Sequence, residues 1–189
     1  MDVRLVAPAD AAAVIQVIHG SFGEEGQPIV AVLDHLRARG DVRAELVAEE
    51  AGEVVGYVAL SRAWLDARDS VVEVLVLSPL GVAPPWQRQG IGPQLLHEAV
   101  LGAESLGAPL VFLEGDPDFY AARGWEQAST YGIEPPSARI PDPACRLVRL
   151  SGYEDSMRGR LVYPDAWWRL DLVGLRDPLL AQLEGAGES

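Results

Sequence analysis

The stretch Val71–Gly92 decides the fold, and it reads VVEVLVLSPLGVAPPWQRQGIG. Apart from Glu73, its first seven residues are all apolar. Alternate residues of a strand face opposite sides of the sheet, so this run predicts a strand covered on both faces. Prolines then end regular pairing, and a helix with an apolar stripe is predicted over residues 90–106. We therefore expect a buried strand, a proline-rich turn and a helix that opens with two glycines.

The entry into this helix has the chemistry of a diphosphate site. A helix N-terminus presents unpaired backbone N–H groups and about half a positive charge. Gly90 and Gly92 lack a Cβ, so a phosphate can approach the backbone closely, and Arg88 adds a fixed positive charge. No Gly-Lys-Ser/Thr follows, which excludes a Walker A loop, and Leu95 stands where a Rossmann fingerprint has its third glycine. The alternative is that both glycines only shape a tight entry into the helix.

Further strands and helices are predicted on both sides of this stretch. Strands are predicted over residues 3–6, 46–50, 54–61, 110–113, 125–130 and 145–150. Helices are predicted over 11–22, 28–39 and 118–123, and Asp10 is expected to cap the first of them. Residues 132–143 are expected to form a loop, and the chain beyond residue 150 an irregular tail.

Composition narrows the class of protein. The chain has 189 residues and a formal net charge of −13, with no Lys and no Asn. This acidic excess disfavours nucleic-acid binding and a polybasic membrane anchor, because both need clustered positive charge. Cys145 is the sole cysteine, and the longest uncharged stretch, Val74–Gln87, is too short to span a bilayer. We expect a cytoplasmic protein that binds no nucleic acid, no membrane and no metal.

The motif and the order of elements resemble the GNAT superfamily of acyl-CoA-dependent N-acyltransferases. The family signature, Gln/Arg-x-x-Gly-x-Gly/Ala after a central strand, is matched by Gln87, Gly90 and Gly92. The resemblance covers about residues 3–150 and implies an α/β, three-layer fold with a central mixed, mostly antiparallel sheet flanked by helices. Residues 1–150 would form the acyltransferase domain. Residues 151–189 would be a C-terminal extension that packs on the domain or forms an interface.

The resemblance also implies acetyl-CoA as co-substrate and assigns a set of contacts to it. The strand end would bond the pantetheine arm through its backbone, and the glycine loop would hold the pyrophosphate. The residues implied are Leu80, Gly81, Val82, Gln87, Arg88, Gln89, Gly90, Ile91 and Gly92. In many family members an Asn between the fifth strand and the helix that carries the tyrosine binds the cofactor. This chain has no Asn.

A second motif, Phe119-Tyr120-x-x-x-Gly124-Trp125, is similar to the family's Phe-Tyr-x-x-x-Gly-Phe. In the family, the tyrosine commonly donates a proton to the leaving CoA thiolate. A phenol with a pKa of about 10 is protonated at neutral pH and suits that role. The alternative is that Phe119 and Tyr120 are only a packing pair on a short helix.

Acylation of an amine also needs a base, because an alkylammonium has no free lone pair. The candidates are Glu114, at the carboxyl end of a buried strand, and Glu73, inside an otherwise apolar strand; a water chain is a third possibility. Glu73 can also be explained as an edge charge or as the partner of an arginine. Glu24 and Glu25, between the first two helices, are either an attraction for a cationic acceptor or a solvated turn.

The expected function is acetyl transfer from acetyl-CoA to a primary amine, by direct attack in a ternary complex. The acceptor would be a small molecule or a peptide, and a homodimer is an open possibility. Three alternatives remain: a non-catalytic CoA-binding sensor of the same fold, an enzyme that binds a different diphosphate, and an interaction module built on the aromatic tail. Trp167 and Trp168 would cover the acceptor cleft, form a subunit interface or pack on the sheet.

Overall fold

The computed structural model describes residues 1–174, and these divide into two units. The first comprises Met1–Ser61 and Leu77–Leu106, and the second comprises Arg62–Val76 and the described chain from Gly107 onward. Two long strands, β3 (Glu53–Ala67) and β4 (Val71–Val82), contribute residues to both units. The part of the expected extension beyond residue 174 lies outside the described residues.

The first unit combines an antiparallel sheet with three long helices. Its further elements are β1 (Asp2–Leu5), α1 (Ala11–Phe22), α2 (Gly26–Ala38), β2 (Val42–Glu50) and α3 (Ile91–Ser105). Short 3-10 turns lie at Pro8–Asp10, Gly23–Glu25 and Pro84–Trp86. β2 pairs antiparallel with β1 on one side and with β3 on the other.

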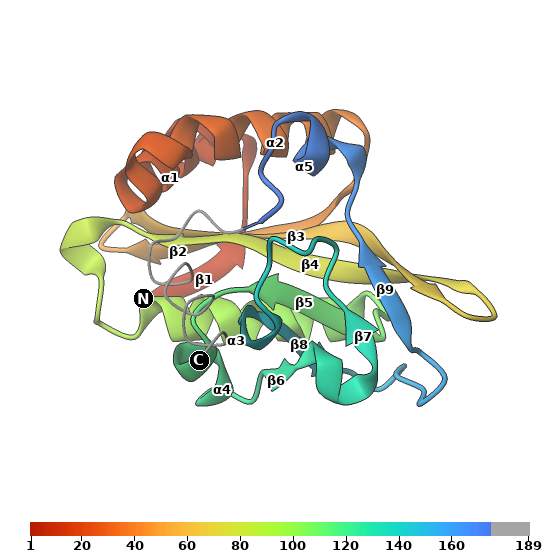
Figure 1. Cartoon of the computed structure of the whole chain (residues 1–189). Helices are drawn as coiled ribbons and strands as arrows, with labels where there is room; N and C mark the ends of the chain where they lie inside the picture. The colour runs from red at the N-terminus through yellow and green to blue at the C-terminus, as the bar shows by residue number, and fades with distance from the viewer. Residues whose placement is uncertain (175–189) are drawn as a thin grey trace, which may run out of the picture. The chain divides into compact units, whose positions relative to one another are not determined.

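Strand alternation gives this unit its layers. Val47 of β2 lies opposite Tyr57 of β3, and both join a buried cluster with α1 and α2. The next pair in the register, Ala48 and Gly56, faces the opposite side, where a Cβ on Gly56 would lie 2.8 Å from the Leu95 side chain of α3. Figure 1 shows α1 and α2 over one face of these strands and α3 over the other. The expected three-layer arrangement is therefore present.

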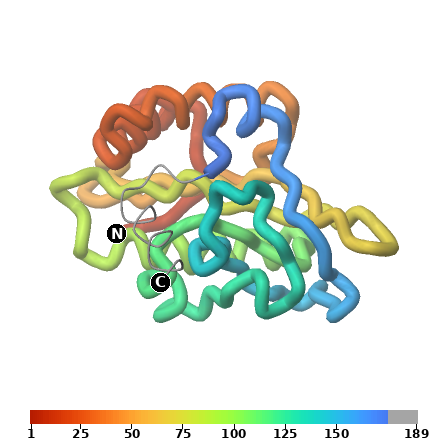
Figure 2. Tube along the Cα trace, in the orientation of Figure 1, coloured from red at the N-terminus to blue at the C-terminus, as the bar shows by residue number. Residues whose placement is uncertain are grey.

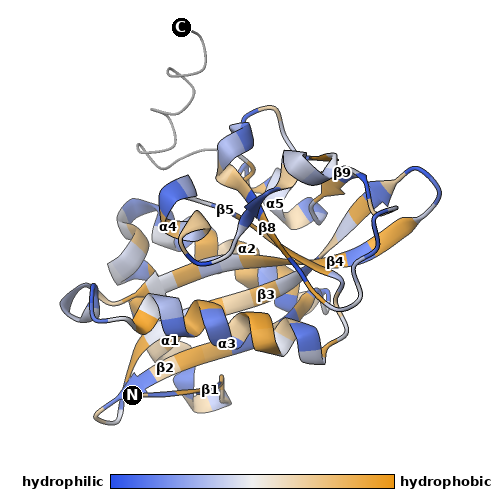
Figure 3. Ribbon diagram, turned by 90° about the horizontal axis from the view of Figure 1, so that it is seen from below, coloured by the Kyte–Doolittle hydropathy of each residue, from blue (hydrophilic) through white to orange (hydrophobic). Residues whose placement is uncertain are grey.

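The amphipathic pattern of α3 matches the predicted helix over 90–106. Its buried positions recur at about one-turn spacing and include Ile91, Leu95, Ala99 and Ala103. Figure 3 shows hydrophobic and hydrophilic residues alternating along this helix.

The second unit contains the two parallel strand pairs found among the described residues. Its further elements are β5 (Leu110–Glu114), α4 (Pro117–Ala121), β6 (Glu126–Gln127), β7 (Ile133–Glu134), β8 (Cys145–Arg149), β9 (Gly159–Val162) and α5 (Asp165–Arg169), with 3-10 turns at Ala128–Tyr131 and Asp142–Ala144. β4 pairs parallel with β5, and β8 pairs antiparallel with both β5 and β6. β9 pairs antiparallel with β3 and parallel with β7.

The prediction of an irregular tail was wrong for residues 159–169. β9 pairs with the last residues of β3, with Leu161 opposite Leu65, and both leucines are buried. The chain can be followed from β8 through a turn into β9 and α5 in Figure 2. The strand predicted over 125–130 was also too long, because β6 ends at Gln127 and a 3-10 turn follows.

The chain has an α/β fold in which a mixed, mostly antiparallel set of strands is flanked by helices, as the sequence predicted. The domain boundary expected near residue 150 stays a prediction. None of the helices within residues 1–174 is both long and apolar enough to cross a membrane.

Candidate active site

The glycine loop is shaped by backbone conformation that favours glycine. Gly90 is the residue before α3 and has a φ of 87°, in the left-handed region that disfavours other side chains. Ile91 and Gly92 open the helix, so their N–H groups have no acceptor within it. A Cβ on Gly92 would meet only Val82 Cγ2, at 3.8 Å, so the space beside this glycine is open. The loop therefore offers backbone donors beside free space.

Side chains fix the strand end next to this loop. The Val82 carbonyl accepts hydrogen bonds from Ser21 Oγ at 3.0 Å and from Gln87 Nε2 at 2.9 Å. A Cβ on Gly81 would lie 2.9 Å from Ser21 Oγ, so α1 approaches the strand closely at this point. Arg88 is exposed and forms no ion pair with another residue of the described chain. All residues predicted to contact the cofactor lie in the first unit.

Glu114 ends β5 in the second unit and has an unusual environment. Its Oε1 accepts a hydrogen bond from Tyr163 Oη at 2.6 Å, and Cys145 lies opposite it in the register of β8. Burial raises the pKa of Glu114 to about 7, although the hydrogen bond from Tyr163 opposes that shift. A carboxyl group with this pKa can accept and release a proton near neutral pH.

Tyr120 lies on α4, a few residues beyond Glu114. Asp116 caps this short helix by accepting a hydrogen bond from the Asp118 N–H at 3.0 Å. The Tyr120 ring packs edge-on against Phe119 and Trp125, with centroids 5.0 Å and 6.0 Å away. Burial raises the pKa of Tyr120 to about 12, so the phenol is protonated, and its hydroxyl bonds to no residue of the described chain.

The weaker candidates lie in different environments from Glu114, and Glu73 is the first of them. Glu73 is exposed on β4, whereas burial is the main cause of the raised Glu114 pKa. Glu24 and Glu25 lie in the 3-10 turn before α2, where no arginine of the described chain pairs with them. Cys145 is fully buried, which raises the pKa of its thiol to about 12 and fits a core residue better than a nucleophile.

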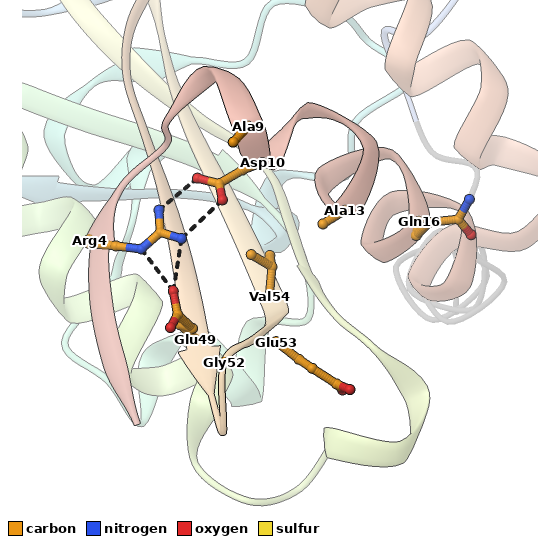
Figure 4. Close-up of a pocket in the computed structure, with 9 residues that line it drawn as sticks. All are labelled: Arg4, Ala9, Asp10, Ala13, Gln16, Glu49, Gly52, Glu53 and Val54. Atoms are coloured by element: carbon orange, nitrogen blue, oxygen red, sulfur yellow. Dashed lines mark hydrogen bonds and ion pairs between the residues drawn. The ribbon is translucent and has the colours of Figure 1, made fainter.

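Asp10 stands at the N-cap position of α1, as predicted, but its side chain forms no capping hydrogen bond with that helix. Its carboxylate instead accepts from the Ala7 N–H at 2.7 Å and from the Arg4 guanidinium at 2.6 Å and 3.0 Å. Arg4 also donates to Glu49 at 2.8 Å, as Figure 4 shows. These side chains line an open pocket of about 420 Å³, with Glu53 at its edge. The sequence did not predict this pocket. Two of its carboxylates, those of Asp10 and Glu49, are already paired with Arg4.

Sequence reasoning also missed Tyr163 as a neighbour of Glu114. The only signal was its place in an aromatic tail with Trp167 and Trp168, and nothing local connects that tail to Glu114. Trp167 is buried and Trp168 is 43% exposed. Within residues 1–174, no group of three or more His, Cys, Asp or Glu side chains is placed to hold a metal ion.

Comparisons with known proteins indicate which class of protein this chain resembles. A family model described as the acetyltransferase (GNAT) domain matches residues 43–127, which include β4, the glycine loop, all of α4 and Trp125. Residues 43–127 thus match a GNAT acetyltransferase domain, and the chain is similar to acyltransferases of that superfamily.

Individual relatives extend this match over most of the chain. The N-acetyltransferase YhbS of Escherichia coli is 28% identical over 162 residues, which cover 84% of this chain and 92% of YhbS. The structure of YhbS in complex with CoA has a TM-score of 0.78 at 25% identity and covers 89% of this chain and 92% of its own. A GNAT acetyltransferase from Brucella melitensis in complex with acetyl-CoA has a TM-score of 0.70 at 26% identity, with coverage of 88% and 97%.

Proposed function

We propose that this protein transfers the acetyl group of acetyl-CoA to a primary amine by direct attack, with Glu114 as the base and Tyr120 as the acid. The observation that carries the proposal is a pair of groups, the Glu114 carboxyl at the end of β5 and the Tyr120 phenol on α4, whose ring lies against Gly115. One is a carboxyl with a pKa of about 7, and the other is a phenol with a pKa of about 12. Two groups with pKa values this far apart suit opposite proton-transfer roles at neutral pH.

The glycine loop suits the diphosphate of CoA. The N–H groups of Ile91 and Gly92 lack acceptors within α3, and the exposed Arg88 supplies a positive charge without a partner among the described residues. The complexes of YhbS with CoA and of the Brucella protein with acetyl-CoA support the same donor here. Because Ser21 and Gln87 occupy the Val82 carbonyl, we assign the pantetheine contacts to Leu80 and Gly81.

The proposed reaction balances with these two residues. Glu114 accepts a proton from the ammonium group of the acceptor, directly or through one water, and so exposes the nitrogen lone pair. The nitrogen bonds to the thioester carbon, the carbon–sulfur bond breaks, and Tyr120 donates its proton to the leaving sulfur. The remaining extra proton on nitrogen returns to Tyr120, and Glu114 releases its proton to water. No covalent enzyme intermediate forms.

The acceptor is proposed to be cationic before it reacts. Glu24 and Glu25 have no cationic partner within the described chain, and the whole chain carries a net charge of −13. Acidic groups of this kind raise the local concentration of an ammonium compound. A small-molecule amine and a peptide amine both satisfy this chemistry.

Donor binding is tested by thermal melting with acetyl-CoA, with NAD and ADP as controls. Acetyl-CoA at about 100 times its Kd should raise the Tm by about 5–10 °C. Gly92→Glu should abolish that shift, because it places bulk and negative charge where the diphosphate binds. Gly92→Ala is the matched control for folding, since a Cβ there has ordinary contact distances. A full shift in Gly92→Glu would contradict the loop assignment.

The acid is tested by Tyr120→Phe. We expect turnover, measured as CoA release with a panel of amines, to fall by about 10²-fold while acetyl-CoA affinity is unchanged. Tyr153→Phe makes the same chemical change at a tyrosine outside the proposed machinery and should behave as the parent. Wild-type turnover in Tyr120→Phe would remove this residue from its role. Donor binding without CoA release from any amine would instead indicate a sensor.

A further inference from the structure

The carboxyl group of Glu114 is held by a residue of the C-terminal extension. Tyr163 Oη donates to Glu114 Oε1 at 2.6 Å, and Tyr163 is only 6% exposed. Burial and the nearby carboxylate raise the pKa of Tyr163 well above its ordinary value, so the phenol stays protonated and remains a donor. Glu114 Oε2 has no hydrogen-bond partner among the described residues.

Other groups around this pair are neutral or directed elsewhere. Cys145, opposite Glu114 on β8, has a thiol pKa of about 12 and is therefore uncharged near neutral pH. Arg146, the next residue on β8, directs its Nη2 to the Trp125 carbonyl at 2.5 Å. The only polar group that engages the Glu114 carboxyl within the described chain is thus the Tyr163 hydroxyl.

Three contacts fix the position of Tyr163. It directly follows β9, whose residues 159–162 pair with residues 64–67 of β3. Its ring packs against the Trp167 ring at a centroid distance of 5.8 Å. Its carbonyl accepts a hydrogen bond from Trp168 Nε1 at 3.2 Å. The hydroxyl is therefore presented to Glu114 by ordered structure on both sides of it.

We infer that Tyr163 is a positioning residue for acetyl transfer: it anchors one oxygen of Glu114 and leaves the other free to accept the proton of the acceptor amine. This inference rests on the proposed function. It makes the segment from β9 to α5 part of the active site, where it sets both the direction and the proton affinity of the base. A hydrogen bond to the ionised carboxyl favours that form, so loss of the bond raises the pKa of Glu114 further.

The experiment compares Tyr163→Phe with Tyr153→Phe in the full-length chain. NMR titration of ¹³C-labelled glutamate carboxyls, with Glu114→Gln to assign the signal, follows Glu114 without any need for activity. We expect a midpoint near pH 7 in the parent and in Tyr153→Phe, and a midpoint about one pH unit higher in Tyr163→Phe. The acidic limb of kcat against pH should move by the same amount, with unchanged acetyl-CoA affinity.

The two readouts separate the inference from the function on which it rests. An unchanged Glu114 midpoint in Tyr163→Phe overturns the inference, whether or not the protein acetylates amines. A raised midpoint in a protein that acetylates no amine supports the anchoring and overturns the proposed function. Trp168→Phe, which removes the donor to the Tyr163 carbonyl at a partly exposed position, is a second variant if Tyr163→Phe does not fold. Trp168→Phe should raise the Glu114 midpoint by less than Tyr163→Phe does. An unchanged midpoint in Trp168→Phe would overturn the inference.

Discussion

Two carboxyl groups of this chain, those of Asp10 and Glu114, are both largely shielded from solvent, but one binds a charged partner and the other a neutral partner. Asp10 is 8% exposed and bonds to the Arg4 guanidinium and the Ala7 N–H, which hold its pKa at about 2. Glu114 bonds to a neutral phenol, and burial raises its pKa to about 7. The comparison shows that a charged partner fixes a carboxylate for structure, whereas a neutral partner leaves it able to transfer protons.

The largest expected effect is on turnover. Glu114→Gln should lower kcat by about 10²-fold or more, because an amide cannot accept the acceptor's proton. Asp10→Asn makes the same change at the structural carboxylate and should leave kcat within about twofold. CoA release measured at saturating acetyl-CoA and several amines checks both. Equal losses in the two variants would break the comparison, since both groups would then act only through structure.

A smaller effect, of opposite sign at the two sites, is expected on stability. The folded pKa of Glu114 lies above the ordinary value of 4.5, so its contribution to stability is present below pH 4.5 and lost as pH rises through 7. Glu114→Gln removes this loss and should stabilise the protein at pH 8 by about 2 kcal/mol, or roughly 5 °C in Tm. Tm measured for both proteins from pH 5 to pH 8 checks this, and parallel curves would contradict the raised pKa.

The smallest effect concerns the partner of Asp10. Its folded pKa lies below the ordinary value of 3.8, so its contribution is present above pH 3.8 and lost as pH falls toward 2. Arg4→Ala should lower Tm by about 1–3 °C at pH 7, and the difference should shrink below pH 4. Calorimetry at both pH values checks this. A difference that persists at pH 2.5 would show that Arg4 acts through packing rather than charge.

Local patterns carried most of the fold prediction. The apolar run of β4 and the stripe of α3 are periodic over many residues, so each gave nearly correct bounds at one end or both. β9 has only four residues, and its pairing with β3 joins positions about a hundred residues apart. Such a strand has no strong signal of its own, because its stability comes from the partner strand.

In the candidate site, too, the residues beside local sequence features could be predicted, and those placed by long-range pairing could not. Glu114 and Tyr120 were identified because each adjoins a local feature, a strand end and a motif. Tyr163 could not be, because its bond to Glu114 depends on the long-range pairing that places β9. Arg4 was missed for a related reason: Asp10 satisfies the local rule for a helix cap, but a guanidinium brought close by β1 binds it instead.

Gly115 lies between the two proposed catalytic residues, and a Cβ there would overlap the Tyr120 ring. The two positions therefore constrain each other: a ring in this orientation at position 120 excludes every side chain at position 115. A related chain with alanine or a larger residue at the first position must place its aromatic ring elsewhere, even if its Phe-Tyr motif is intact. The residue at position 115 thus offers a simple way to sort relatives into those that can share this acid and those that must use another.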